Sequence, residues 1–154
     1  MRRSPILTVL ALALASCGGG TEPVEQDLCK IQPLPLSGDA AGPTVTDVGL
    51  ELQGGVRVVL FATATDPQGT DNLYPVQQSI GVFPDKECRG SPIVLQDDIS
   101  GSGEEETFGT VLTAADSPAL YAAIAAESSW PVDISFSDAD GHRTAGRVAA
   151  RITR

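Results

Sequence analysis

Apolar and polar side chains alternate in short segments along most of this chain. The clearest case is residues 132–137, in which Val132, Ile134 and Phe136 are separated by polar residues. The same period of two recurs in three other segments: residues 48–52, 107–113 and 147–153. Successive side chains of a β-strand point to opposite faces of its sheet, so this pattern predicts strands with one buried face. The chain is therefore expected to be mainly β.

Three further strands are predicted from apolar runs that end at turn residues. Residues 56–65 contain the run 58–61, which is expected to be buried on both faces. Residues 73–83 are predicted to form a strand that ends before Pro84, and residues 93–95 a shorter one. Glycine, aspartate and proline between these segments favour tight turns. The spacing is typical of a sheet protein with short connections.

One helix is predicted over residues 117–127. Ser117 can cap its start, and Pro118 suits the first helical position. Residues 96–106, which are rich in acidic side chains and glycine, are predicted to form a loop. About seven short strands with one short helix predict a single β-sandwich.

Two stretches resemble bacterial immunoglobulin-like and cadherin-like domains. Ala62-Thr63-Ala64-Thr65-Asp66-Pro67-Gln68-Gly69 is similar to their second strand and its turn, and Ile134-Ser135-Phe136-Ser137-Asp138-Ala139-Asp140-Gly141 to their sixth. The resemblance implies a single immunoglobulin-like β-sandwich of about seven strands over residues 43–153. The Cys…Trp…Cys pattern of antibody domains is absent from the sequence, so no antigen-receptor function is implied.

The N-terminus has the pattern of a secretory signal. Arg2 and Arg3 precede an apolar run of about a dozen residues. A helix of that length rises roughly 18 Å, which is too short for a hydrocarbon core of about 30 Å. Leu14-Ala15-Ser16-Cys17 then resembles the lipobox of bacterial lipoproteins.

The resemblance to lipoproteins implies that Cys17 is lipidated and becomes the first residue after cleavage. Two or three acyl chains, such as palmitate, would anchor the protein firmly in a membrane, whereas one chain holds only marginally. Gly18, in place of the aspartate that favours inner-membrane retention, implies the outer membrane. We therefore expect a signal peptide at 1–16, a lipidated tether and extended arm at 17–42, and the sandwich at 43–154. An ordinary signal peptide cut after Ala15 is the alternative.

The chain is strongly acidic. Its net charge is −10, and cleavage of a signal containing Arg2 and Arg3 would leave 20 acidic against 8 basic side chains. This balance argues against nucleic acid as a partner, because phosphate neutralisation requires basic residues. No second apolar run is long enough to span a membrane. The expected link to the membrane is therefore the lipid on Cys17.

The other two cysteines are Cys29 and Cys88. In an oxidising compartment their natural pairing is a disulfide, which would hold the N-terminal arm on the domain. Two free buried thiols are the alternative. A catalytic dithiol is not expected, because the sequence contains no C-x-x-C motif.

Only weak candidates for a site with chemistry are found. Four aspartates near two turns are weak calcium candidates: Asp66, Asp71, Asp138 and Asp140. Asp and Gly favour turns without any metal, so no metal or other cofactor is expected. The only histidine, His142, follows a turn and is expected to be exposed. With no nucleophile motif such as G-x-S-x-G, the protein is not expected to be an enzyme.

The leading hypothesis is a non-enzymatic binding or structural module of the cell envelope, with an envelope protein as a candidate partner. One rival is a carbohydrate-binding module or small envelope enzyme, for which exposure of Tyr74 or Trp130 would be informative. Another is an accessory subunit of an envelope complex. Arg143, Arg147 and Arg151 could face an acidic partner, or could be the solvated face of an edge strand.

Overall fold

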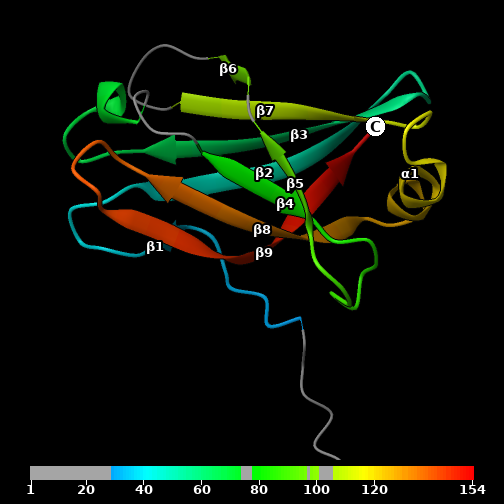
Figure 1. The fold of residues 1–154 in the computed structure, drawn as a ribbon, viewed down its shortest axis with the longest axis horizontal. Coiled ribbons are helices and arrows are strands. Elements are labelled where there is room, and N and C mark those ends of the chain that lie inside the picture. Colours follow the sequence, from blue (N-terminus) through cyan, green and yellow to red (C-terminus); the bar gives the residue numbers. More distant parts are fainter. Residues whose placement is uncertain (1–28, 74–77, 97, 101–105) are drawn as a thin grey trace, which may run out of the picture.

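A computed structural model of the chain describes residues 29–73, 78–96, 98–100 and 106–154, and its fold is mainly β (Figure 1). It contains one α-helix, α1 (Pro118–Ala125), and a short 3₁₀ turn, η1 (Thr70–Asn72). The strands are β1 (Leu36–Ser37), β2 (Thr44–Gln53), β3 (Arg57–Thr65), β4 (Ser79–Val82), β5 (Ile93–Gln96), β6 (Asp98–Ser100), β7 (Glu106–Thr113), β8 (Ser129–Ser137) and β9 (Arg143–Thr153). The predicted class, mainly β with one short helix, is confirmed.

The strands form one curled sheet in the order β5-β4-β8-β9-β2-β3-β7-β6, with β1 paired to β2. Lettered from β2 as A, B, C, C′, D, E, F and G, the order has the halves C′-C-F-G and A-B-E-D of an immunoglobulin-like domain. All pairs are antiparallel except β2 with β9, which is parallel and joins the two halves. The halves of the expected sandwich are therefore hydrogen bonded into one sheet.

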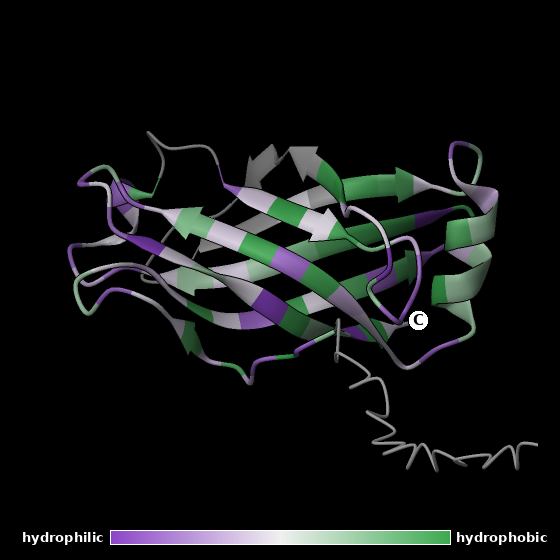
Figure 2. Cartoon of the chain, turned by 60° about the horizontal axis from the view of Figure 1, so that its bottom comes forward, coloured by the Kyte–Doolittle hydropathy of each residue, from purple (hydrophilic) through white to green (hydrophobic). Residues whose placement is uncertain are grey.

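The core lies between the two halves and follows the alternation in the sequence. Along β8, Val132, Ile134 and Phe136 are 0 to 2% exposed. Figure 2 shows the same alternation as hydrophobic and hydrophilic bands along the strands. One expectation was wrong: of the run 58–61 in β3, only Val58 and Leu60 are buried, because Val59 and Phe61 lie on the outer face and are half-buried.

Two boundaries also differ from the prediction. In the segment expected to be a strand from 73 to 83, the strand begins only at Ser79. Gln78 lies just before it with its side chain buried, and its amide donates to the carbonyls of Leu73 and Ser137. In the expected loop 96–106, three residues pair with β7 as β6. Neither the buried Gln78 nor the short strand β6 can be predicted from the alternation of apolar and polar residues.

The helix lies between β7 and β8 and covers one end of the sheet, beside the C-terminus (Figure 1). It spans fewer residues than the predicted 117–127, and Pro118 begins it as expected. The Ser117 side chain makes no capping hydrogen bond, contrary to expectation. Leu120 and Ile124 are buried in the core, and Tyr121 packs against it. Within the described residues no helix is long and apolar enough to cross a membrane.

The N-terminal arm is fixed to the domain in two ways. Cys29 and Cys88 form the predicted disulfide, with their Cα atoms 5.2 Å apart. Farther along, the Gln32 N–H donates to the Arg147 carbonyl at 2.7 Å, and the Gly38 N–H donates to Thr144 Oγ1 at 2.7 Å. The expected irregular arm therefore runs beside β9 before it enters the sheet.

Candidate functional site

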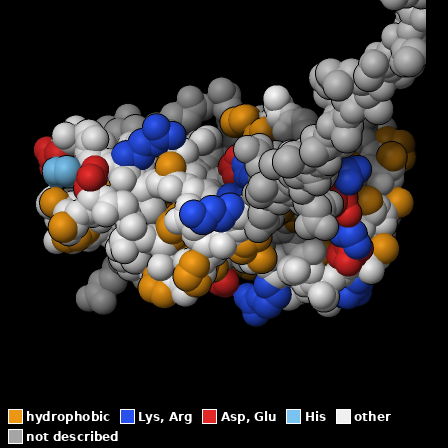
Figure 3. Space-filling model, turned by 90° about the horizontal axis from the view of Figure 1, so that it is seen from below, with side chains coloured by type: hydrophobic (Ala, Val, Ile, Leu, Met, Phe, Trp, Pro, Cys, Tyr) orange, Lys and Arg blue, Asp and Glu red, His pale blue; other side chains and the backbone are white. Residues whose placement is uncertain are grey.

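The outer face of β4, β5, β8 and β9 carries a groove of about 460 Å³. Its volume lies within the ordinary range for ligand sites, roughly 300–1,000 Å³. Lys30 and Gln32 of the arm line the groove together with residues of all four strands. Figure 3 views this side of the domain and shows Lys and Arg side chains spread across it.

The strand register lines up the residues that form the groove. Val94, Gly81, Asp133 and Arg147 are successive partners across β5, β4, β8 and β9. Any larger residue at position 81 would crowd the groove, because a Cβ on Gly81 would lie only 3.0 Å from the Cβ of Pro92. Val94 is 61% exposed on the outermost of these strands. The groove is thus polar in the middle and apolar at the β5 side.

Arg147 is held rigidly in the groove. Its Nε donates to Asp133 Oδ1 at 2.7 Å and its Nη2 to Oδ2 at 3.1 Å. The guanidinium carbon lies 4.2 Å from the centre of the Phe83 ring. Hydrogen bonding to Asp133 raises the pKa of Arg147, so its positive charge is permanent. The guanidinium edge that forms paired hydrogen bonds is thus occupied by Asp133, and Arg147 contributes a fixed positive charge to the groove.

Basic side chains outnumber acidic ones in the groove, against the charge of the whole chain. Lys30, Arg143 and Arg147 line it with a single acid, Asp133. Arg143 is exposed and its Nε donates to Ser135 Oγ at 2.9 Å. The interpretation of the arginines as the face of an edge strand is wrong, because β9 lies between β8 and β2.

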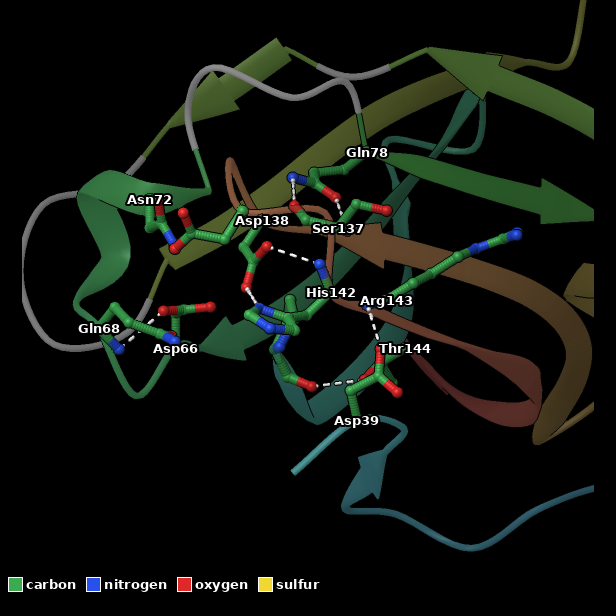
Figure 4. A network of polar contacts seen from close by, with 12 residues as sticks. Asp39, Asp66, Gln68, Asn72, Gln78, Ser137, Asp138, His142, Arg143 and Thr144 are labelled. Atoms are coloured by element: carbon green, nitrogen blue, oxygen red, sulfur yellow. Dashed lines mark hydrogen bonds and ion pairs between the residues drawn. The ribbon is translucent and has the colours of Figure 1, made fainter. Parts of the chain in front are cut away.

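A second polar cluster lies at the end of the domain opposite α1, where the turns 66–72 and 138–142 meet (Figure 4). We call this region the loop end. The Asn72 carbonyl accepts from the Ala139 N–H at 2.9 Å, and Asn72 Nδ2 donates to Asp140 Oδ2 at 3.3 Å. The two turns are therefore joined although they are far apart in sequence.

Asp138 and His142 form the centre of the loop end. Asp138 Oδ1 accepts from the His142 N–H, and Asp138 Oδ2 lies 2.8 Å from His142 Nδ1. The Asp138 side chain is fully buried, whereas that of His142 is 35% exposed. His142 was expected to be an exposed turn residue, which is wrong in part, because one ring nitrogen is engaged.

The contact shifts the pKa values of both groups. The hydrogen bond to Asp138 raises the pKa of His142, against a smaller opposing effect of burial. For Asp138, burial acts to raise the pKa, but the hydrogen bonds and charge of His142 together outweigh it and lower the pKa. The pair is therefore stabilised as an imidazolium and a carboxylate.

Asp66 lies at the same end, as Figure 4 shows, and is 8% exposed. Its Oδ1 accepts from the Gln68 N–H at 2.8 Å. Its Oδ2 is buried and has no hydrogen-bond partner. A buried carboxylate oxygen without a donor is unfavourable and calls for an explanation.

All four weak calcium candidates lie at the loop end, where Asp138 and Asp140 group with His142, whereas Asp71 is exposed in η1 and is not a member of that group. Sequence reasoning missed His142 as a member, and its position four residues after Asp138 was the available signal. Trp130 is buried, with Nε1 donating to the Phe83 carbonyl at 3.0 Å, so it offers no exposed ring to a sugar. Cys17 and Tyr74 lie outside the described residues.

No known family matches the chain, and no curated protein matches it.

Proposed function

We propose that this protein is a cell-envelope lipoprotein, anchored through acylated Cys17, whose domain is a non-enzymatic binding module. Its partner would be an acidic segment of another envelope protein, held in the groove of β4, β5, β8 and β9. The observation that carries this proposal is the gathering of Lys30, Arg143 and Arg147 in one groove of an acidic chain. Charge complementarity of this kind favours specificity and fast association.

The arm supports the proposal by linking anchor and groove. Lys30 lines the groove directly after Cys29, whose disulfide fixes the start of the arm. The segment between Cys17 and Cys29 can span at most about 40 Å when fully extended. The groove would therefore be presented to proteins close to the membrane, with outer-membrane placement favoured by Gly18.

Apolar side chains give weaker support for a protein partner. The large exposed apolar residues of the described part are Ile31, Val56, Ile93, Val94 and Val111. Only Ile93 and Val94 are adjacent, and they lie on β5 at the edge of the sheet. The broad apolar patch that would mark an obligate interface is not formed by these residues. A polar groove with an apolar rim suits a transient partner better.

The carbohydrate-binding alternative has less support. Sugar recognition by stacking needs exposed aromatic rings, and Trp130 is in the core. An accessory role in an envelope complex is compatible with the same groove and would differ in the identity of the partner.

The test measures binding of octaglutamate by the mature protein in detergent, with octaglutamine as the neutral control. We expect binding of octaglutamate that weakens as salt rises, because the contacts are ionic. Ala145→Trp, which fills the groove, should weaken binding at least tenfold. Ala149→Trp, on the same face of β9 but outside the groove, should change it less than twofold.

A charge-matched pair of variants completes the test. Arg143→Glu lies in the groove and Arg151→Glu lies on the same strand outside it. Both change the net charge equally, so a groove site predicts loss of binding only for Arg143→Glu. Equal losses in the two variants, or preferential binding to phosphatidylglycerol vesicles, would contradict the peptide-binding role.

A further inference from the structure

We propose that the loop end binds one divalent metal ion of the zinc class through Asp66, Asp138, Asp140 and His142. This site is separate from the groove and does not depend on the proposed function. It would tie the β3–β4 connection to the β8–β9 turn at the end of the domain opposite α1 (Figure 1).

Three of the four groups already converge. Among the described residues, Asp138, Asp140 and His142 can each offer a ligand atom within 4.8 Å of the others. Asp138 Oδ2 and His142 Nδ1 are 2.8 Å apart. Donors on one tetrahedral zinc ion, at bonds of about 2.1 Å, lie roughly 3.4 Å from each other. A small opening of the Asp138–His142 contact would therefore admit the ion.

Asp66 supplies an independent observation. It comes from the other turn, is 8% exposed, and its Oδ2 is buried without a hydrogen-bond partner. In Figure 4 the free side of this carboxylate points toward Asp138 and His142. The turn accounts for the position of Oδ1, which accepts from the Gln68 N–H. It does not account for the burial of Oδ2 without a donor. A cation in the cluster would provide the missing partner.

The donor set favours zinc over calcium. Three carboxylates and one imidazole make four donors, the number that zinc takes in its structural sites. Calcium prefers six to eight oxygen donors, and magnesium keeps several waters in an octahedral shell. An imidazole suits zinc and its neighbours in the transition series. The sequence marked the aspartates as calcium candidates, but with His142 included the expected metal is zinc.

The ion can also reach the site. Asp138 and Asp66 are buried, but Asp140 is exposed and His142 is 35% exposed. Entry would therefore pass between the Asp140 carboxylate and the imidazole. A doubly charged ion among three carboxylates also offsets most of their mutual repulsion.

The test uses the untagged mature protein in detergent, stripped with a chelator and then given ZnCl₂, MnCl₂ or CaCl₂ alone. Calorimetry and elemental analysis after gel filtration should give one zinc per chain, with calcium bound at least tenfold more weakly. Because the chain has one histidine, its ring signals in a nuclear magnetic resonance spectrum belong to His142 alone. These signals should shift on saturation with zinc.

Matched variants decide the ligand assignment. Asp66→Asn and His142→Gln should each weaken zinc binding at least tenfold, whereas Asp71→Asn, in the same connection but exposed, should not. Unfolding in chelator confirms that each variant is folded. Equal zinc binding by Asp66→Asn and Asp71→Asn, or no bound zinc with unmoved ring signals, would overturn the proposal. Calcium binding that is tighter than zinc and independent of His142 would overturn the choice of metal.

Discussion

The two ends of the domain are stabilised by different interactions. At the end with α1, which we call the helix end, Leu120 and Ile124 are buried and the disulfide ties the arm to the β4–β5 connection. At the loop end, hydrogen bonds of Asn72, Asp138 and His142 join the two turns. Apolar burial and a covalent bond do not titrate near neutrality, whereas the polar contacts do. The helix end should therefore depend on reduction and packing, and the loop end on pH.

The largest expected effect is at the helix end. Replacing Cys29 and Cys88 by serine should lower the free energy of unfolding by about 4 kcal/mol, because a disulfide between residues 59 apart restricts the unfolded chain. Urea unfolding of the oxidised protein and the double variant measures this difference. Reductant should have the same effect on the wild-type protein and none on the variant. A loss below about 1 kcal/mol would show that the arm is held by its hydrogen bonds alone.

A packing change at the same end comes next. Ile124→Ala should lower the free energy of unfolding by about 3 kcal/mol, since Ile124 is 0% exposed and its removal leaves a cavity. Ala122→Lys, on the exposed side of α1, is the matched control and should be nearly neutral. If both changes cost the same, α1 would not be packed on the core as described.

At the loop end the expected effect is smaller. Asp138→Ala should lower the free energy of unfolding by about 2 kcal/mol, because the His142 N–H loses its buried acceptor. Asp140→Ala removes an exposed carboxylate from the same turn and should cost about 0.5 kcal/mol or less. Both are measured by urea unfolding in chelator. A larger cost for Asp140→Ala than for Asp138→Ala would show that Asp138 is not the centre of the cluster.

The subtlest difference between the ends is their dependence on pH. The pKa of His142 is raised above 6.5, so its stabilisation is complete below that pH and is lost as pH rises through the folded-state pKa. The pKa of Asp138 is lowered below 3.8, so its contribution is present above that pH and is lost as pH falls through the folded-state pKa. Melting temperatures in chelator across this range, compared with His142→Gln, should show the loss at high pH only in the wild-type protein. An identical pH profile in the wild-type protein and the His142→Gln variant would show that the Asp138–His142 pair is not the source of the pH dependence.

The sequence predicted the parts of the fold that depend on local pattern. Alternation of Val132, Ile134 and Phe136 marked β8, and Pro118 marked the start of α1. It failed where a distant contact decides the local structure. Gln78 is polar yet buried, because the carbonyl and N–H of Ser137 satisfy its amide. The short β6 forms only because β7 provides a partner.

The candidate sites were predictable only in part, for the same reason. The turn around Asp138 and Asp140 was visible, but the approach of Asp66 depends on how the two turns meet. The groove depends on strand register, which places Gly81, Asp133 and Arg147 side by side although they are distant in the chain. The regular spacing of Arg143, Arg147 and Arg151 was visible in the sequence, but the position of their strand inside the sheet was not.

Intact mass of the protein purified from membranes, before and after reduction and alkylation, is the most direct test of the account. We expect the mass of residues 17–154 plus two or three acyl chains. Thiols should become alkylatable at Cys29 and Cys88 only after reduction. An unacylated chain whose thiols react without reduction would contradict both the proposed lipid anchor on Cys17 and the Cys29–Cys88 disulfide that fixes the arm beside the groove.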